Sequence, residues 1–487
     1  MQRRDNLVRQ NPRTTFILPH VVNFPENLPY VGGLLDENPN MYIDFAARMD
    51  ELGRQPYTTR EFFNKIMDSG SLIALFDFEN RQKVFPDVDG RFKFSVLIFG
   101  GKESKNPAAD FAFFMHRVEE LDEKKRHIKL SGKDMALVNP NTRTCPVFRS
   151  RRDADLTKAI YRRVPILIDK TRKQGGNPWG IKFVRMFDQT NDAELFLDRD
   201  ELVKRGTKQE GNRWKKGKQV FLPLYEAKMV QAYDHRAASV IIESENWVRQ
   251  GQTEATSPVA HQNPEFVVQP RWWVEENEVD RVLGGNANPA YLCYKDVTSP
   301  TNQRTMIAAI IPHVAVVNSA PLVLFDEKTT WRQSCCLLAN LNSYALDFVA
   351  RQKVGGVHLN FFIVQQLPMF APDRYAERCH WNKRQTLEKW ISDLVLKLTC
   401  TAEDMRPLAE AAGFDPPIYK WNPGERAQIM AELDAAFFLL YGIEREDVQY
   451  MLSTFKGLAS ESDEANMLFA TDVGVMEAYD RMAQVQE

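Results

Sequence analysis

A helix followed by two apolar runs of strand length most constrains how this chain can fold. Residues 58–61 (Thr-Thr-Arg-Glu) have the form of a helix N-terminal cap, and Gly70 is placed to end that helix. The nearly continuous apolar run 72–78 is typical of a buried strand. A turn-rich stretch then leads to a second run at 92–99. This order of elements predicts an α/β arrangement, of which these residues are a piece.

The remaining periodicity predicts four regions along the chain. Residues 1–57 form an irregular lead-in, and residues 58–130 form the α/β piece. Residues 131–375 mix short strands with loops, and include a helix near 334–350 that Gly355 and Gly356 end. Residues 376–487 are helical: one apolar stripe covers 387–398, and Asn422 caps a helix that Gly442 stops.

Composition indicates a folded protein of several domains. The chain has 487 residues, of which 44% are hydrophobic and 11% aromatic. No run approaches the roughly 18–20 apolar residues of a membrane span, and no secretory signal opens the chain. Six cysteines without Cys-x-x-Cys spacing predict reduced thiols and no zinc site. We therefore expect a cytoplasmic protein that has no membrane partner and no metal.

Charge is unevenly distributed along the chain despite a net charge of −2. Residues 143–173 hold ten Lys/Arg against three Asp/Glu, and residues 199–218 hold eight against three, whereas residues 441–487 hold three against ten. Four tryptophans lie in or near the basic runs, which favours a nucleic-acid partner for the middle of the chain. The alternative is a pair of ordinary solvated faces.

A search for catalytic motifs finds a short pattern that would suit a nuclease. Glu226-Ala-Lys228 is the skeleton of a metal-dependent nuclease site if Asp188 or Asp198 supplies another carboxylate. Such a three-residue pattern is common by chance. A nuclease therefore stays the weakest of the alternatives.

Longer segments, taken in order, resemble the second half of large adenine-specific DNA methyltransferases. These are the type IIG restriction–modification enzymes and the phage-exclusion methylases of BREX or DISARM type. The resemblance spans about residues 58–480. It rests on Leu-Phe-Asp-Phe-Glu-Asn-Arg at 75–81, Val-Phe-Pro at 84–86, Arg-Phe-Lys-Phe-Ser-Val-Leu-Ile at 91–98, Asn-Pro-Asn-Thr-Arg-Thr-Cys-Pro at 139–146, Arg-Ser-Arg-Arg at 149–152, Asn-Pro-Trp-Gly at 177–180, Pro-Leu-Tyr-Glu-Ala-Lys-Met at 223–229, Tyr-Asp-His-Arg at 233–236, Pro-Arg-Trp-Trp at 270–273, Arg-Gln-Lys-Val-Gly-Gly at 351–356, Leu-Asn-Phe-Phe-Ile at 359–363 and Gln-Leu-Pro at 366–368.

The chain departs from this family at its catalytic motifs. Members carry a glycine-rich loop that binds S-adenosyl-methionine, and then an Asn-Pro-Pro-Tyr/Phe motif. Neither is present, and Asn288-Pro-Ala-Tyr291 is a near match without the preceding loop. The resemblance thus implies a remnant of a Rossmann-like catalytic domain at 58–130, a mixed α/β target-recognition domain at 131–375 and a helical C-terminal region. We predict no catalytic residue here and expect no methyl transfer from this polypeptide alone.

The resemblance also implies where a flipped adenine would stack. A methyltransferase must take its target base out of the duplex. In the family, the strand pair near residues 85–86 forms a wall of the base pocket, so Phe85 is the first candidate for stacking and Phe94 the second. The alternative is that both are ordinary core phenylalanines.

Basic residues of the middle region are the predicted DNA contacts. Lys353 and Arg351 precede two glycines that let backbone amides approach a phosphate, although a helix C-terminus explains the same pattern. His235 has an equally good structural interpretation. The predicted contacts are Arg143, Arg149, Arg151, Arg152, Lys228, His235, Arg236, Arg351 and Lys353.

The resemblance implies duplex DNA as the partner and S-adenosyl-methionine as the family's cofactor. It also implies a separate chain carrying the cofactor-binding half, or restriction or defence subunits. The leading hypothesis is the recognition part of an adenine methyltransferase. The alternative is a non-catalytic specificity subunit.

Overall fold

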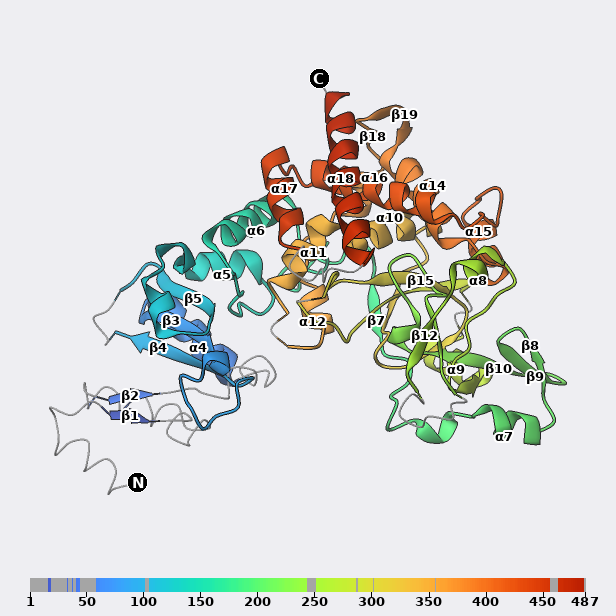
Figure 1. Cartoon of the computed structure of the whole chain (residues 1–487), viewed down its shortest axis with the longest axis horizontal. Coiled ribbons are helices and arrows are strands. Elements are labelled where there is room, and N and C mark those ends of the chain that lie inside the picture. Colours follow the sequence, from blue (N-terminus) through green and yellow to red (C-terminus); the bar gives the residue numbers. More distant parts are fainter. Residues whose placement is uncertain are drawn as a thin grey trace. The chain divides into compact units, whose positions relative to one another are not determined.

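The chain folds into two compact units with a mixed α/β architecture (Figure 1). The computed structural model describes residues 16–18, 33, 37, 41–43, 58–100, 105–242, 251–285, 288–300, 302–354, 356–455 and 463–485. Unit 1 comprises residues Met1–Arg163 and unit 2 comprises Val164–Glu487. The predicted mixed α/β class is confirmed. A Rossmann-like remnant and the boundaries at residues 57, 130 and 375 stay predictions.

Unit 1 is built around a four-stranded sheet in the order β4-β3-β5-β6. Strand β3 is antiparallel to β4 and parallel to β5, and β6 is antiparallel to β5. Most of the predicted lead-in lies outside the described residues. The elements are β1 (Phe16–Leu18), β2 (Met41–Ile43), α4 (Thr58–Asp68), β3 (Leu72–Glu79), β4 (Lys93–Phe99), β5 (Ala109–Met115), β6 (Ile128–Leu130), α5 (Gly132–Val138) and α6 (Arg151–Arg163).

The two faces of this sheet are covered unequally. Leu75, Leu97 and Phe111 point into a core that also contains residues of α4, α5 and α6. The opposite face carries a small cluster around Phe78 and Met115. On this second face Val96 of β4 is 44% exposed. The predicted helix at 58–70 and strands at 72–78 and 92–99 are confirmed, because alternate strand residues reach opposite faces and both faces carry apolar side chains.

The β part of unit 2 contains two sheets that share one apolar core. One has the order β15-β14-β17-β7, and the other β13-β10-β9-β8 with β16 paired to β10. The elements are β7 (Lys182–Val184), α7 (Arg199–Lys204), β8 (Lys208–Glu210), β9 (Arg213–Lys216), β10 (Gln219–Tyr225), β11 (Ala238–Val240), β12 (Thr253–Ala255), α8 (Pro258–Gln262), β13 (Trp273–Glu275), α9 (Glu276–Leu283), β14 (Ala290–Tyr294), β15 (Ala308–Pro312), β16 (Ala315–Val316) and β17 (Leu322–Leu324).

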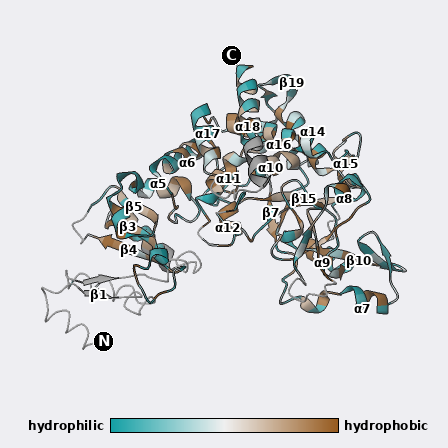
Figure 2. Cartoon of the chain, viewed as in Figure 1, coloured by the Kyte–Doolittle hydropathy of each residue, from teal (hydrophilic) through white to brown (hydrophobic). Residues whose placement is uncertain are grey.

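The second part of unit 2 is helical, with one short hairpin. In Figure 2 the short helix α12 stands out as hydrophobic. The elements are α10 (Trp331–Asn342), α11 (Tyr344–Arg351), α12 (Phe361–Val364), α13 (Pro372–Tyr375), β18 (Arg378–Cys379), β19 (Asn382–Thr386), α14 (Leu387–Thr399), α15 (Arg406–Ala411), α16 (Pro423–Leu440), α17 (Arg445–Ser453) and α18 (Asp463–Gln484).

The predicted helix at 334–350 is two helices and not one. Ser343 lies between α10 and α11 in an extended conformation, and its hydroxyl accepts a hydrogen bond from the Leu346 amide at 3.3 Å. Serine favours such cap positions because its side chain satisfies a free amide. Helix α11 ends at Arg351 with Gln352 as its C-cap, so the predicted glycine end is also wrong. Gly355 lies outside the described residues.

The predicted helices beyond residue 375 are confirmed. The side chain of Asn422 accepts from the Glu425 amide at 3.1 Å and starts α16. The buried Asp347 of α11 accepts from the amides of Thr305 and Met306, which lie just before β15. Within the described residues, no helix is both long and apolar enough to cross a membrane.

Candidate nucleic-acid interface

A buried asparagine orders the loop that carries Phe85. Asn80 is fully buried; its Nδ2 donates to the carbonyl oxygens of Phe85 and Val88, and its Oδ1 accepts from the Phe85 amide, each at 2.9 Å. Because a buried amide with all these partners is costly to move, the loop has one preferred conformation. Sequence reasoning did not identify Asn80, since a loop asparagine has no distinctive periodicity.

The two predicted base-pocket phenylalanines lie together. The ring of Phe85 meets Phe94 edge to face with centroids 4.8 Å apart, and Phe94 stacks on Phe78 at 5.0 Å. Phe85 is 47% exposed, whereas Phe94 is half-buried. A further ring that the sequence did not single out, Phe92, is 54% exposed. The arrangement leaves an aromatic surface that can stack with a base, with Phe94 as its support.

The predicted basic contacts of unit 1 differ in how exposed they are. Arg143 forms two hydrogen bonds with the Asp68 carboxylate, which raises the pKa of Arg143. Arg149, Arg151 and Arg152 are exposed before and in the first turn of α6. The guanidinium of Arg149 lies 5.6 Å from the ring centroid of Phe114. The exposed group can therefore contact a polyanion, whereas Arg143 links α4 to the loop after α5.

Arg236 is inside the protein, so its predicted DNA contact is not possible in this fold. It is 0% exposed, and its guanidinium donates to the carbonyl oxygens of His261, Asn263, Phe266 and Thr401 at 2.9–3.1 Å. Three of these carbonyls belong to residues 261–266, at the end of α8 and just after it. The fourth, that of Thr401, lies between α14 and α15. Arg236 thus ties the β part of unit 2 to its helical part.

His235 belongs to the same buried region. It is 1% exposed, and its Nε2 lies 3.0 Å from the Asp404 carboxylate. Burial alone would raise the pKa of Asp404, but the charge and hydrogen bond of His235, followed by the charge of Arg236, outweigh burial and hold the pKa below its ordinary 3.8. His235 is therefore a structural histidine, the alternative that the sequence left open.

Lys228 is used locally and does not complete a nuclease site. Its Nζ lies 2.9 Å from Glu226 Oε2 and donates to the Gly251 carbonyl at 2.6 Å. Asp188 accepts from turn amides and Asn318, and Asp198 caps α7. Among the described residues, no group of three or more His, Cys, Asp or Glu side chains could hold a metal ion. The nuclease alternative therefore lacks its second carboxylate.

The residues at the end of α11 hold loops together. Arg351 donates to the carbonyl oxygens of Asn302 at 2.5 Å and Gln303 at 2.7 Å, and its guanidinium covers the Phe455 ring at 3.7 Å. Burial lowers the pKa of Lys353 well below its ordinary value. The geometry favours the helix-terminus interpretation of this segment over the phosphate-binding one.

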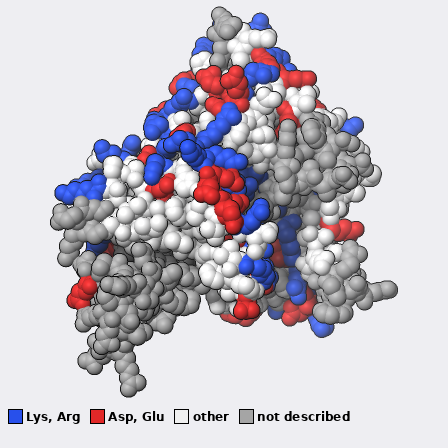
Figure 3. Space-filling model, turned by 60° about the vertical axis from the view of Figure 1, so that its left-hand side comes forward, with Lys and Arg blue, Asp and Glu red and all other residues white. Residues whose placement is uncertain are grey.

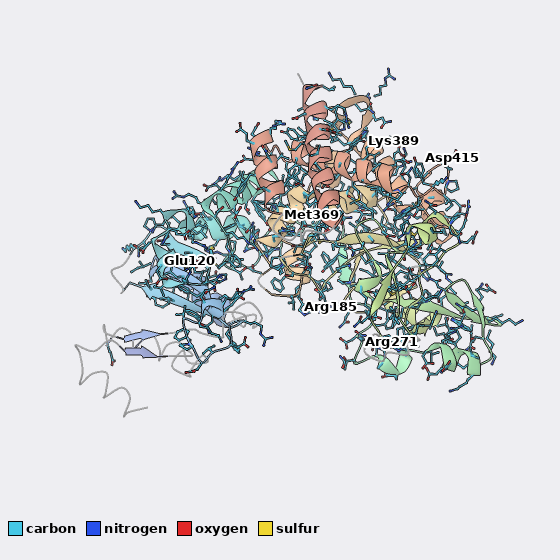
Figure 4. The ribbon with its side chains drawn as sticks, viewed as in Figure 1. Glu120, Arg185, Arg271, Met369, Lys389 and Asp415 are labelled. Carbon is cyan, nitrogen blue, oxygen red and sulfur yellow. The ribbon has the colours of Figure 1, made fainter. Side chains whose placement is uncertain are left out.

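A neighbouring arginine that sequence reasoning missed is better placed. Arg185, which follows β7 (Figure 4), is 47% exposed at its side chain. Its guanidinium lies 4.9 Å from the Phe361 ring centroid and donates to Asn360 Oδ1 at 3.2 Å. His358 beside it is held by Asp296 at 3.0 Å. We call Arg185, His358 and Asn360 the Arg185 surface. Arg185 and Asn360 are 175 residues apart in the sequence, so no local sequence pattern could have identified this surface.

The second basic run forms an antiparallel ribbon. Strands β8 and β9 pair from Lys208 with Lys215 to Glu210 with Arg213, at one edge of the sheet. In Figure 1 they lie away from α14 and α16, at the other end of unit 2. We define the basic ribbon as residues 204–218. Its exposed cationic residues are Lys204, Arg205, Lys208, Lys216 and Lys218.

Two tryptophans fix the base of the basic ribbon. Trp214 and Trp273 are buried and meet edge to face with centroids 6.1 Å apart, in a cluster with Leu202. The indole of Trp273 donates to the Asn212 carbonyl at 2.6 Å, which anchors the ribbon turn. The basic run at 199–218 was the sequence signal for this element, but only the pairing of the strands shows that its charges share one ribbon. Figure 3, which turns the left-hand side of Figure 1 forward, shows Lys and Arg interspersed with Asp and Glu on the described surface.

Asn288-Pro-Ala-Tyr291 is structural. Tyr291 lies in β14, is 1% exposed and has its hydroxyl 2.8 Å from His313 Nδ1. Its ring is therefore buried in the sheet and cannot stack on a base, in agreement with a chance match.

Comparison with known proteins gives a distant likeness to a solved structure. No protein-family model and no curated protein matches the chain. Among solved structures, the chain is similar to the type IIL restriction-modification enzyme MmeI in complex with DNA, with a TM-score of 0.39 and 12% identity. The match covers 94% of this chain and 52% of that protein, so this chain spans about half its length. A likeness at this level does not assign a function.

Replacing Arg236 by Met should strongly destabilise unit 2. The change leaves four buried carbonyls without their donor and Asp404 without a neighbouring charge, so we expect a loss of about 3–5 kcal/mol in the free energy of unfolding. Arg271→Met is the matched control, because this half-buried arginine covers the Trp272 ring at 4.3 Å and should cost only about 1 kcal/mol. Urea unfolding measures both; equal losses would contradict the role of Arg236.

The lowered pKa of Asp404 predicts an acid-sensitive contribution to stability. A carboxyl whose pKa is depressed in the folded state stabilises the fold above its ordinary pKa, and this stabilisation is lost as the pH falls below about 4. Asp404→Asn should therefore lower the thermal midpoint at pH 7, and the gap to the wild type should narrow toward pH 3.5. A gap that stays constant over this range would show that Asp404 contributes no charge-dependent stability.

Proposed function

We propose that this chain recognises duplex DNA as the target-recognition part of an adenine methyltransferase of a restriction–modification or phage-defence system. The observation that carries the proposal is the basic ribbon of residues 204–218. A two-stranded antiparallel ribbon fits the major groove, which is about 12 Å wide, and its lysines and arginines neutralise phosphates. The chain has a net charge of −2, so this attraction is local.

The base of the basic ribbon favours binding because it is already ordered. Trp214, Trp273 and Leu202 bury their side chains beneath it, so its backbone loses little freedom on contact with DNA. Lys215 is paired with Glu210 and Lys216 donates to the Arg205 carbonyl, each at 2.5 Å, which leaves Lys204, Lys208 and Lys218 to meet the phosphates. Lysine is suited to this role, since it acts as a point charge without a required geometry.

The Arg185 surface supplies the chemistry for reading bases. Arginine donates to guanine edges. The Phe361 ring and the Asp296 carboxylate, 3.9 Å away, orient Arg185, and Asp296 also orients His358. In unit 1, exposed Arg149, Arg151 and Arg152 would contact phosphates, and Phe85 would stack with the flipped base.

The described part of unit 1 does not fit S-adenosyl-methionine. Such a ligand needs a glycine loop between a strand and a helix, where backbone amides approach closely. Gly132 stands between β6 and α5, but a Cβ there would lie 3.3 Å from Asp68 Oδ1 and 3.7 Å from an Arg143 nitrogen, so this space is filled. We therefore derive no methyl transfer step in this chain and assign that step to a separate cofactor-binding half.

A non-catalytic DNA-binding specificity subunit is the second candidate. The filled space at Gly132 favours it as much as a split methyltransferase. The two candidates differ in whether a catalytic partner acts at the site that this chain selects.

Removing two ribbon lysines should reduce the salt dependence of DNA binding. Each lysine–phosphate ion pair that is removed lowers the slope of log affinity against log salt by about 0.9 for duplex DNA. We expect Lys208→Gln with Lys218→Gln to lower the slope by about 1.8 and to weaken binding at all salt concentrations. Filter binding of the purified chain over a salt series measures this, with tritiated S-adenosyl-methionine transfer assayed in parallel.

The matched control replaces Lys328 and Lys420, which are also exposed in unit 2 but lie outside the basic ribbon. This pair should leave the slope unchanged. Equal slopes for both pairs, or no binding by the wild type at low salt, would contradict the proposal. Methyl transfer by the chain alone would contradict the assignment of catalysis to another chain.

A further inference from the structure

A basic cavity lies in the helical part of unit 2, far along the chain from the basic ribbon. It has a volume of about 520 Å³ and lies between α13, the turn of the β18–β19 hairpin and the end of α16. Its lining residues are Arg374, His380, Trp381, Lys383, Leu439 and Leu440. We call it the hairpin pocket. Its volume falls within the range of about 300–1,000 Å³ that small-molecule sites occupy.

The hairpin pocket combines cationic walls with one fixed aromatic ring. Trp381 packs edge to face on Trp390 of α14, with centroids 5.3 Å apart and planes at 79°. The indole Nε1–H of Trp381 is shielded from solvent and has no acceptor among the described residues. A buried donor without an acceptor is unfavourable, and a small movement toward an oxygen in the cavity would satisfy it. Leu439 and Leu440 add an apolar floor.

Charge around the hairpin pocket favours an anion. Residues 373–386 contain four Lys/Arg and His380 against two Asp/Glu. Arg374 is paired with Glu377, whereas Lys383 and His380 are exposed at the hairpin turn. The pocket therefore keeps positive charge at its rim after this pair is counted.

We propose that the hairpin pocket binds a nucleotide unit. Its phosphate would lie against Lys383, His380 and Arg374, and its base against the ring of Trp381. Aromatic rings stack with any base, because every base has a π-face. The same chemistry is offered by a free nucleotide and by a nucleotide within a single strand. The proposal does not depend on the DNA recognition proposed for the basic ribbon.

Calorimetric titration of the full chain with dAMP and with inorganic phosphate tests this assignment. We expect dAMP to bind at least ten-fold more tightly than phosphate, because phosphate lacks the stacking base. Lys383→Gln should weaken dAMP binding at least five-fold, and Lys420→Gln, an exposed lysine outside the pocket, should not. Trp381→Leu should lose binding and Trp381→Phe should retain most of it, with thermal unfolding confirming that each variant is folded.

Each outcome identifies the source of the nucleotide or overturns the proposal. Binding of dAMP with this variant pattern supports a free nucleotide. Binding of a short single-stranded oligonucleotide but not dAMP, weakened by Lys383→Gln alone, supports a nucleotide within a strand. Equal affinities of Lys383→Gln and Lys420→Gln for the bound nucleotide would overturn the proposal. So would a failure of both dAMP and the oligonucleotide to bind. The Lys208→Gln and Lys218→Gln pair should bind dAMP like the wild type, which separates this result from the test of the basic ribbon.

Discussion

The buried guanidinium of Arg236 is the interaction on which the arrangement of unit 2 depends. It donates to three carbonyls near α8 and to Thr401 between α14 and α15, and so joins the β part to the helical part. A buried cation without such partners would cost several kcal/mol, so these segments must stay together. Asp404 and His235 complete the same buried network. Because this network joins the two parts of unit 2, it fixes the surfaces on one part relative to those on the other.

The exposed groups that we propose for DNA binding each have a rigid support. Trp214 and Trp273 fix the basic ribbon, the Phe361 ring orients Arg185, and Asn80 orders the loop of Phe85. In each case a buried or stacked group supplies the order, and an exposed group next to it supplies the chemistry. Binding then costs less conformational entropy than it would for flexible side chains.

Local patterns predicted the elements of this fold better than they predicted its site. The helix at 58–68, the strands at 72–79 and 93–99 and the Asn422 cap follow from periodicity and capping, which act over a few residues. Arg236 and His235 carry the same charge pattern as surface residues, and only contacts across the chain reveal that they are buried. Arg185 was missed for the converse reason: its partner Asn360 lies 175 residues away.

Hydrogen exchange of the full chain with and without duplex DNA tests the central claim most directly. Amides of a ribbon that docks on DNA exchange more slowly in the complex, because binding suppresses local opening. We predict slower exchange at residues 204–218 and around Arg185, with the stretch 261–266, whose carbonyls Arg236 holds, unchanged. Protection confined to the helices beyond residue 387, with the basic ribbon unaffected, would contradict the claim that this ribbon binds DNA.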